Sequence, residues 1–466
     1  MPGTVGVTTG DEAGGSTGGA AGELRRTLTF RDLVVYGLLF IAPMAPVGIF
    51  GTLLAASHGA ITVVYLVATV AMAFTAYSYA QMVQVVPRAG SVYTYARVGL
   101  GEGAGFVAGW MAMLDYLLIP AVAYLFSGIA MHALVPSVHQ WVWTALAVVV
   151  TTLLNLWGVR VAAVVGFAVL ALEIVVLAVF VVAAVVALAA QGAQRGWAVP
   201  LTGEGGFSVT AVLSAVSVAV LSYLGFDAIA SFAEEAAGGA RRVARAVLTC
   251  LVVAGVLFAV QTYLAALLAP MSAAGLAAKP GEQGAAFYTT VDAAVGGWLH
   301  DLVAVSKAIG AAFAALAGQA AAGRLLFAMA RDRRLPGAMS KVDAGSGVPR
   351  RALLGAALVT LVAAVWAARR DDGLDQLSSV VNVGALTAFA LLHASVIGWF
   401  RVRRQAEAPS MLRHVVVPVL GLAVVLAVIV EASATAQAVG AVWLAVGLVV
   451  LAVQYRGRRR AAGPRA

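Results

Sequence analysis

Twelve apolar blocks, separated by short polar segments, constrain the fold of this sequence more than any other feature. A transmembrane helix needs about 20 mostly apolar residues. The 466 residues are 62% hydrophobic and only 11% charged, whereas a soluble domain has roughly 25% charged residues. A soluble enzyme, a secreted disulfide scaffold and a disordered chain are therefore excluded. The predicted spans are 32–56, 61–86, 104–133, 141–158, 161–190, 209–233, 244–269, 300–330, 352–367, 377–400, 414–430 and 435–455.

Lysine and arginine are distributed asymmetrically between the loops that these spans define. Such residues gather in the cytoplasmic loops of membrane proteins. With the N-terminus inside the cell, all but six of the 30 lie on the cytoplasmic side. The six are Arg195, Lys279, Arg369 and Arg370 on the opposite side, and Lys307 and Arg324 within the eighth span. We therefore expect a multi-pass protein of the cell membrane with both termini cytoplasmic. Because the net charge of +9 arises from the basic residues of the cytoplasmic loops, no nucleic-acid partner is expected.

The two ends of the chain predict tails that flank a twelve-helix domain over 31–455. Residues 1–22 are rich in Gly, Thr and Ala and lack apolar periodicity, so we expect a disordered cytoplasmic tail over 1–30 and no signal peptide. Residues 456–466 read as a basic cytoplasmic tail. The one cysteine, Cys250, excludes an intrachain disulfide. No CxxC motif or histidine-rich cluster suggests a metal, and no cofactor is expected.

Two spans contain breaks at the depth of the membrane centre. Span one has Pro43 and Pro46 close to Gly48, and span six contains the segment Ser222–Asp227. A proline removes a backbone donor, and unsatisfied backbone in hydrocarbon survives only beside a cavity or packed protein. Breaks at matching positions of two five-helix halves point to an inverted-repeat transporter with its site at the midplane. The alternative is an ordinary proline kink and a glycine packing contact.

Ionisable residues inside membrane spans are expensive and usually functional. Glu173, in the fifth span, has only apolar sequence neighbours. Desolvation disfavours a charged carboxyl, so Glu173 suits a proton carrier; the alternative is a structural contact with another helix. The other candidates are Asp115, Asp227, Lys307, Arg324 and His393.

Each of these other candidates also has a structural alternative. Asp115 is near enough to its helix end for an interfacial ion pair, and Asp227 could cap the restart of span six. We expect Lys307 and Arg324 to extend toward opposite membrane surfaces. His393 is expected to be a packing residue.

Four segments in order along the chain resemble the signatures of the amino acid–polyamine–organocation (APC) permeases. They are Pro87–Tyr95, Gly105–Trp110, Leu224–Ala228 followed by Glu234 and Glu235, and Gly323–Asp332 followed by Leu335 and Pro336. The resemblance covers about 30–455. It implies an all-α integral membrane protein of twelve transmembrane helices, with a LeuT-type 5+5 inverted repeat and two peripheral helices. It also implies secondary transport, often coupled to protons.

Within the family, Leu114–Leu117 and Val381–Leu386 look like the third and tenth helices of bacterial putrescine importers. Those importers carry an aspartate in the broken first helix, where this chain has Gly48. A diamine needs anionic partners, whereas the carboxylate of an amino acid needs donors such as those of a helix N-terminus near Gly48. Some relatives place a lysine in helix five where others bind sodium, and Glu173 occupies that position by resemblance.

The prediction is a secondary active transporter that imports amino acids or polyamines, with the substrate, a coupled proton and the lipid bilayer as its partners. An exchanger of the same fold is the alternative. A membrane-embedded enzyme would need a clustered His/Asp/Glu or Ser/His constellation, which is missing from the sequence, and no Walker motif is present. Glu173 is the predicted proton-coupling residue. The predicted substrate-binding residues are Ala42, Met44, Ala45, Gly48, Asp115, Tyr116, Tyr223, Gly225, Phe226, Asp227 and Asn382.

Overall fold

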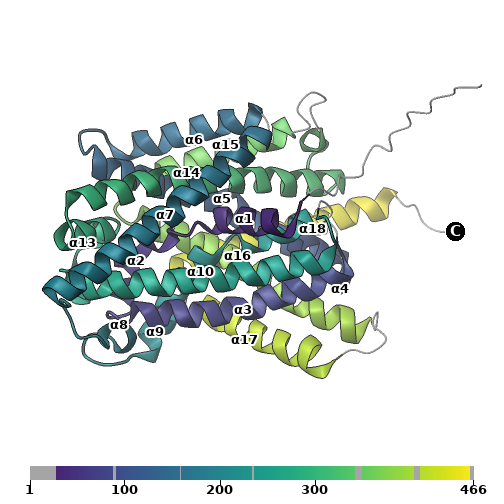
Figure 1. Cartoon of the computed structure of the whole chain (residues 1–466). Coiled ribbons are helices and arrows are strands. Elements are labelled where there is room, and N and C mark those ends of the chain that lie inside the picture. Colours follow the sequence, from purple (N-terminus) through teal and green to yellow (C-terminus); the bar gives the residue numbers. More distant parts are fainter. Residues whose placement is uncertain are drawn as a thin grey trace, which may run out of the picture.

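Long runs of Ala, Val and Leu form helices because a helix satisfies its own backbone groups where no water is available. In the computed structural model these runs become a bundle of helices that lie roughly along one common direction (Figure 1). The structure describes residues 28–87, 91–157, 159–233, 236–341, 349–403 and 410–461. Parts of the two predicted tails (1–27 and 462–466), residues 88–90 of the first signature, and Glu234 and Glu235 lie outside the described residues.

All twelve predicted blocks coincide with helical segments, with ends that differ by a few residues. In the described part of the chain, nine helices are long and apolar enough to cross a membrane, and α1 (Phe30–Ile41) with α2 (Ala45–Ala56) forms a further span bent by 43°. Two shorter ones are α6 (Gln140–Trp157) and α9 (Val209–Ala219). The nine are α3 (Ile61–Val85), α5 (Glu102–Leu134), α7 (Val159–Gln191), α10 (Ala240–Leu268), α14 (Gly297–Arg331), α15 (Arg350–Ala367), α16 (Gly373–Ile397), α17 (Val417–Val430) and α18 (Ala434–Ala461).

Short helices in the connections complete the fold. One of them, α4, begins within the first family-like signature and packs against α5 and α16. The others are at the opposite end of the bundle, where α13 packs against α14 and α2. Their bounds are α4 (Ser91–Gly99), α8 (Val199–Thr202), α11 (Ala273–Ala278), α12 (Pro280–Gln283) and α13 (Ala286–Ala294).

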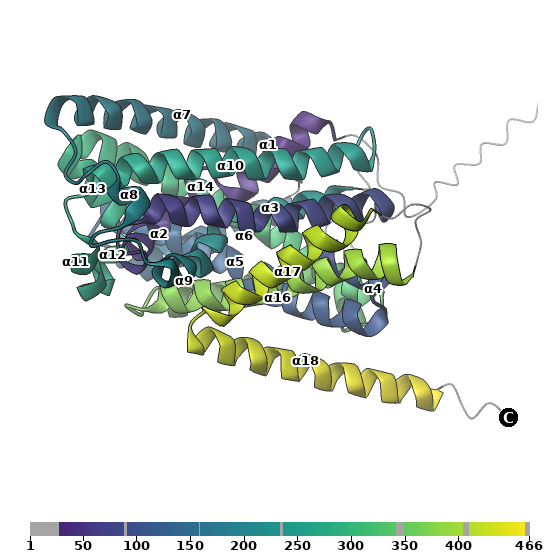
Figure 2. The ribbon, with the colours of Figure 1, turned by 90° about the horizontal axis from the view of Figure 1, so that it is seen from below.

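Helix α5 lies at the centre of the bundle and packs against α14, α16, α6 and α15. The last two helices are peripheral. Only 28% of the apolar stretch of α17 and 17% of that of α18 is buried, against 67% for α16. Figure 2 shows α18 along the outside of the bundle. The expected pair of peripheral helices is therefore present.

Span one is interrupted between Ile41 and Ala45. Ala42 adopts a φ of 59°, in the left-handed region that residues with a side chain rarely occupy. Side chains from two other helices satisfy the carbonyl groups that the break exposes. Gln261 Nε2 on α10 donates to the Pro43 oxygen at 2.9 Å, and Lys307 Nζ on α14 donates to the Met44 oxygen at 3.0 Å.

Span six is interrupted at Leu224 and Gly225. The α-helix ends at Ala219 and a 3₁₀ turn, Val220–Tyr223, follows it; a second 3₁₀ segment, Phe226–Phe232, begins after the break. Gly225 has a φ of +114°, which a side chain would disfavour. Both breaks predicted from the sequence are thus present.

Ion pairs lie at the two ends of the bundle. At the end where α1 begins, Arg97 lies 2.6 Å from Asp332, after α14, and 3.2 Å from Glu102 at the start of α5. At the other end Arg195 pairs with Glu204. Arg195 also donates to the carbonyl of Ala269, just after α10, at 3.0 Å. The contacts of Arg97 with Asp332 and of Arg195 with Ala269 join segments that belong to different spans.

Candidate functional site

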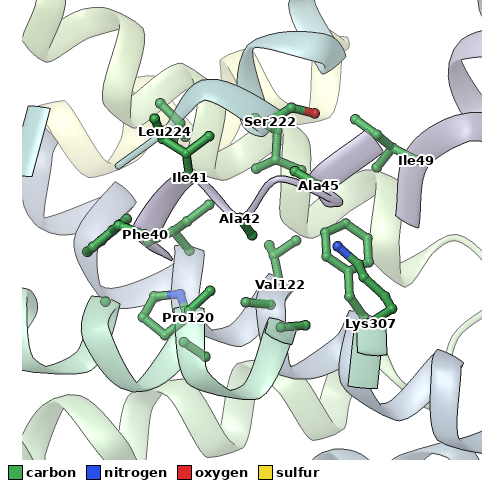
Figure 3. Close-up of a pocket in the computed structure, with 18 residues that line it drawn as sticks. Phe40, Ile41, Ala42, Ala45, Ile49, Pro120, Val122, Ser222, Leu224 and Lys307 are labelled. Carbon is green, nitrogen blue, oxygen red and sulfur yellow. The ribbon is translucent and has the colours of Figure 1, made fainter. Parts of the chain in front are cut away.

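A small cavity of about 50 Å³ lies between the broken segments of spans one and six (Figure 3). Its walls come from α1 and α2, from α5, from the break of span six, and from α14. Apart from Ser222 and Lys307, the lining side chains are apolar or glycine. Cavities of this kind hold at most a few water molecules. The site is therefore a small, mostly apolar space with one cationic side chain in its wall.

Lys307 is buried in this wall, with 2% of its surface exposed. Its ammonium nitrogen donates to the Met44 carbonyl and lies 5.0 Å from the centre of the Phe126 ring. The expectation that Lys307 extends toward a membrane surface is therefore wrong. An ammonium in an apolar setting needs partners, and the carbonyl freed by the break, together with the aromatic face, provides them. Figure 3 shows Lys307 and Phe40 at opposite ends of the cavity, with Ala42 between them.

Glu173 on α7 is completely buried against α14. Its carboxylate occupies the space next to Gly310, where an added Cβ would lie 2.1 Å from Glu173 Oε1. Neither carboxylate oxygen has a hydrogen-bond partner among the described residues. Gly310 is three residues beyond Lys307 on the same helix, so both side chains lie along one stretch of α14.

A second, tighter pocket adjoins the cavity and contains two acids. Its lining includes Asp115 and Tyr116 from α5, and Gly225 and Asp227 from span six. Asp227 Oδ2 accepts a hydrogen bond from the Tyr116 hydroxyl at 2.7 Å, and its Oδ1 accepts one from the Gly225 N–H at 3.3 Å. Asp115 is 4% exposed, and its Oδ1 has no hydrogen-bond partner among the described residues.

The predicted substrate residues fall into three groups. Ala42 and Ala45 line the cavity. Asp115, Tyr116, Gly225 and Asp227 line the inner pocket. The remaining five lie behind the walls: Met44, Gly48, Tyr223, Phe226 and Asn382.

The residues behind the walls still support the site. Met44 provides the carbonyl that Lys307 binds. Gly48 faces the Phe126 ring, which a Cβ would approach to 2.5 Å. The Tyr223 hydroxyl bonds to Thr69 at 2.6 Å, away from the cavity. Phe226 packs against Tyr79 and Phe389, and Asn382 donates to the Ser217 carbonyl at 2.7 Å.

Two other ionisable residues in the spans lie outside the site. His393 is buried between Ser78, at 2.9 Å, and Thr75, at 3.3 Å, in agreement with its expected packing role. The Arg324 guanidinium lies 4.9 Å from the centre of the Phe232 ring, on α14 beyond the cavity.

The sequence reasoning missed Phe40 and Gln261 and misplaced Lys307. Gln261 could have been found, because it lies inside an apolar span and a buried amide needs hydrogen-bond partners. Nothing in the sequence distinguishes Phe40 from the other apolar residues of α1. The sequence also does not show which face of α14 points inward, because small apolar residues occur on every face of that helix.

Comparison with known proteins assigns the chain to a family. Residues 33–449 match the family model for amino acid permeases. The chain is 29% identical to the low-affinity putrescine importer PlaP of Escherichia coli strain K12, over 92% of this chain and 94% of that protein. It is 28% identical to the branched-chain amino acid permease BcaP of Bacillus subtilis strain 168, over 92% of each.

A more distant relative is the vacuolar cationic amino acid transporter 4 of Arabidopsis thaliana. It is 28% identical over 80% of this chain and 63% of that protein. These relatives are permeases and transporters, and the match of the family model spans both broken helices, the cavity and the inner pocket. The chain belongs to the amino acid permease family.

Proposed function

We propose that this protein is a secondary active transporter that imports amino acids across the cell membrane and couples their entry to protons. The observation that carries the proposal is the cavity between two broken spans. Unwound backbone at membrane depth is tolerated where it lines a binding site, and substrate sites of inverted-repeat carriers lie at such breaks. The proposal includes a LeuT-type 5+5 arrangement with both termini in the cytoplasm.

The charge in the cavity wall favours an amino acid over a diamine. The Lys307 ammonium and the start of α2 at Ala45 lie at one end of the cavity. A cation and a helix N-terminus both attract a carboxylate. A diamine would instead bring a positive charge toward Lys307, without the acid that putrescine importers carry at the position of Gly48. We place the substrate carboxylate at this end and the amino group toward the inner pocket.

A polyamine is the second candidate. Asp115 and Asp227 in the inner pocket are two acids that could hold an ammonium group. The similarity to a putrescine importer points in the same direction. The two candidates differ in what the Lys307 end of the cavity must bind, a carboxylate or a cation.

We propose Glu173 as the proton carrier. Its oxygens have no hydrogen-bond partner in the described structure, and it lies against the helix that also carries Lys307. Protonation removes a negative charge from this buried position. The two protonation states therefore favour different packing of α7 against α14, and a difference between states is what drives a conformational change.

Uptake by the purified protein in proteoliposomes tests the proposal. Radiolabelled L-leucine, L-lysine and putrescine are compared with and without an inward-acid proton gradient. We expect at least one amino acid to accumulate against its concentration gradient, only when the proton gradient is present. Uptake that requires unlabelled substrate inside the vesicles, whatever the proton gradient, identifies an exchanger. Uptake of putrescine alone would favour the second candidate, and absence of any uptake would overturn both.

A further inference from the structure

The aromatic ring of Phe40 separates the cavity from the inner acidic pocket. Phe40, Ile119 and Leu224 are the residues that line both spaces. Among these three, Phe40 comes from α1 and reaches across to the break of span six. The cavity has a free volume of about 50 Å³, whereas that of the inner pocket is close to 0 Å³. The inner pocket is thus collapsed behind the ring.

The Phe40 ring packs directly against the backbone of Gly225. A Cβ added to Gly225 would lie 1.9 Å from Phe40 Cδ1, so the ring occupies the space that any side chain there would need. On the opposite helix, Gly318 of α14 would bring a Cβ to 3.7 Å from Phe40 Cζ. Two glycines therefore flank the ring, and rotation of Phe40 away from Gly225 would open the boundary between the two spaces.

Beyond the ring lies the Asp115 carboxylate, one oxygen of which has no hydrogen-bond partner among the described residues. The Asp115 side chain is buried, lines the inner pocket and has an oxygen without a hydrogen bond among the described residues. Asp227 beside it is held by Tyr116, by the Gly225 N–H and by Tyr79 at 3.5 Å. A buried polar atom without a partner is costly, and an acid in this state is suited to receive a cationic group.

We propose that Phe40 is an internal gate, and that the inner pocket behind it is a second binding station for an organic ammonium group. This inference deepens the transport function proposed above. When the ring leaves Gly225, the cationic end of a substrate in the cavity moves onto Asp115 and Asp227. The station lies toward the end of the bundle where α1 begins, so it is the next site on the path out of the cavity in that direction.

Chemical access to the inner pocket tests the gate without any need for transport. The full-length protein in lipid nanodiscs carries Cys250→Ala, which removes the native thiol, and Asp115→Cys, which places a thiol in the pocket. Its reaction with cationic 2-aminoethyl methanethiosulfonate is followed by intact-mass spectrometry. We expect Phe40→Ala to accelerate the reaction by about tenfold or more, which corresponds to a barrier lower by about 1.4 kcal/mol.

The matched control is Phe126→Ala, because Phe126 lines the cavity but not the inner pocket. It should enlarge the cavity and leave the reaction rate of the introduced thiol unchanged. Anionic 2-sulfonatoethyl methanethiosulfonate should react more slowly than the cationic reagent, since Asp227 remains. If the alanine variant does not assemble, Phe40→Leu makes the same comparison with a smaller expected increase.

Equal rates with and without the Phe40 ring would overturn the gate. Equal rates for the two reagents in the Phe40→Ala protein would overturn the cation station. Because the assay measures access, a protein that transports none of the substrates above still reports on the gate. Failure of the transport proposal and failure of this inference are therefore distinguishable.

Discussion

The Lys307 ammonium donates a hydrogen bond of 3.0 Å to the Met44 carbonyl, and so joins α14 to the break in span one. The neighbouring carbonyl, that of Pro43, is bound from α10 by Gln261 at 2.9 Å. The break is thus anchored by two side chains, of which only Lys307 also lines the cavity. This difference allows anchoring and substrate binding to be tested separately.

Replacement of Lys307 by Met should lower both stability and amino acid uptake. The Met44 carbonyl loses its charged donor and keeps only the Val47 N–H at 3.1 Å, and a hydrogen bond to a charged group contributes about 1.5–3 kcal/mol. The matched control, Gln261→Leu, removes the other anchor. Thermal unfolding should show a similar loss for both variants, whereas proteoliposome uptake should show a change of preference from amino acid to putrescine for Lys307→Met alone. An unchanged preference would remove Lys307 from the substrate site.

Replacement of Gly48 by Leu should abolish uptake and leave membrane insertion intact. A Cβ at Gly48 would already lie 2.5 Å from the Phe126 ring, so a larger side chain must push that ring into the cavity. The control is Gly355→Leu on α15, where an added Cβ meets no atom within 4 Å. Uptake at the wild-type rate by Gly48→Leu would show that the cavity lies on no transport path.

Replacement of Asp115 or Asp227 by Asn should weaken putrescine uptake more than leucine uptake, if putrescine is carried. Hydrogen bonds to charged groups contribute about 1.5–3 kcal/mol, so the apparent affinity for putrescine should fall by about ten- to a hundredfold. The exposed Asp292 provides the control variant, Asp292→Asn. Small and equal effects on both substrates would identify the two acids as structural.

Replacement of Glu173 by Gln should uncouple transport from the proton gradient. The amide keeps the shape of the carboxyl but cannot exchange a proton, so binding and exchange persist while accumulation is lost. Uptake against a concentration gradient is measured at inward-acid and at symmetric pH, with the exposed Glu431→Gln as control. Accumulation with the wild-type pH dependence in Glu173→Gln would show that a group other than Glu173 couples transport to the proton.

The helices were predictable from the sequence because membrane spans are defined by apolar length alone. The breaks were predictable as well, since proline disrupts a helix and glycine tolerates the backbone conformations of a break, and Pro43, Pro46 and Gly225 lie within predicted spans. The helix α4 was not predicted, because Ser91–Gly99 lies between two spans and lacks their apolar length.

The site was only partly predictable. Asp115 and Asp227 could be proposed from the sequence because a carboxyl inside a span is rare. Their common pocket could not be found, because it depends on the packing of α5 against the break of span six. Lys307 was misjudged for a related reason: an ammonium on a long stem can reach a surface or turn inward, and only the position of the Met44 carbonyl decides between the two.

The bond from Lys307 to the Met44 carbonyl also has a consequence for how the protein responds to its medium. A cation that binds from solution stabilises a fold by an amount that grows with the logarithm of its concentration, by mass action. The Lys307 cation is covalently attached, so its local concentration is fixed when the chain is synthesised. Removal of salt by dialysis therefore cannot withdraw it from the break. The anchor of span one does not depend on the ion content of the medium.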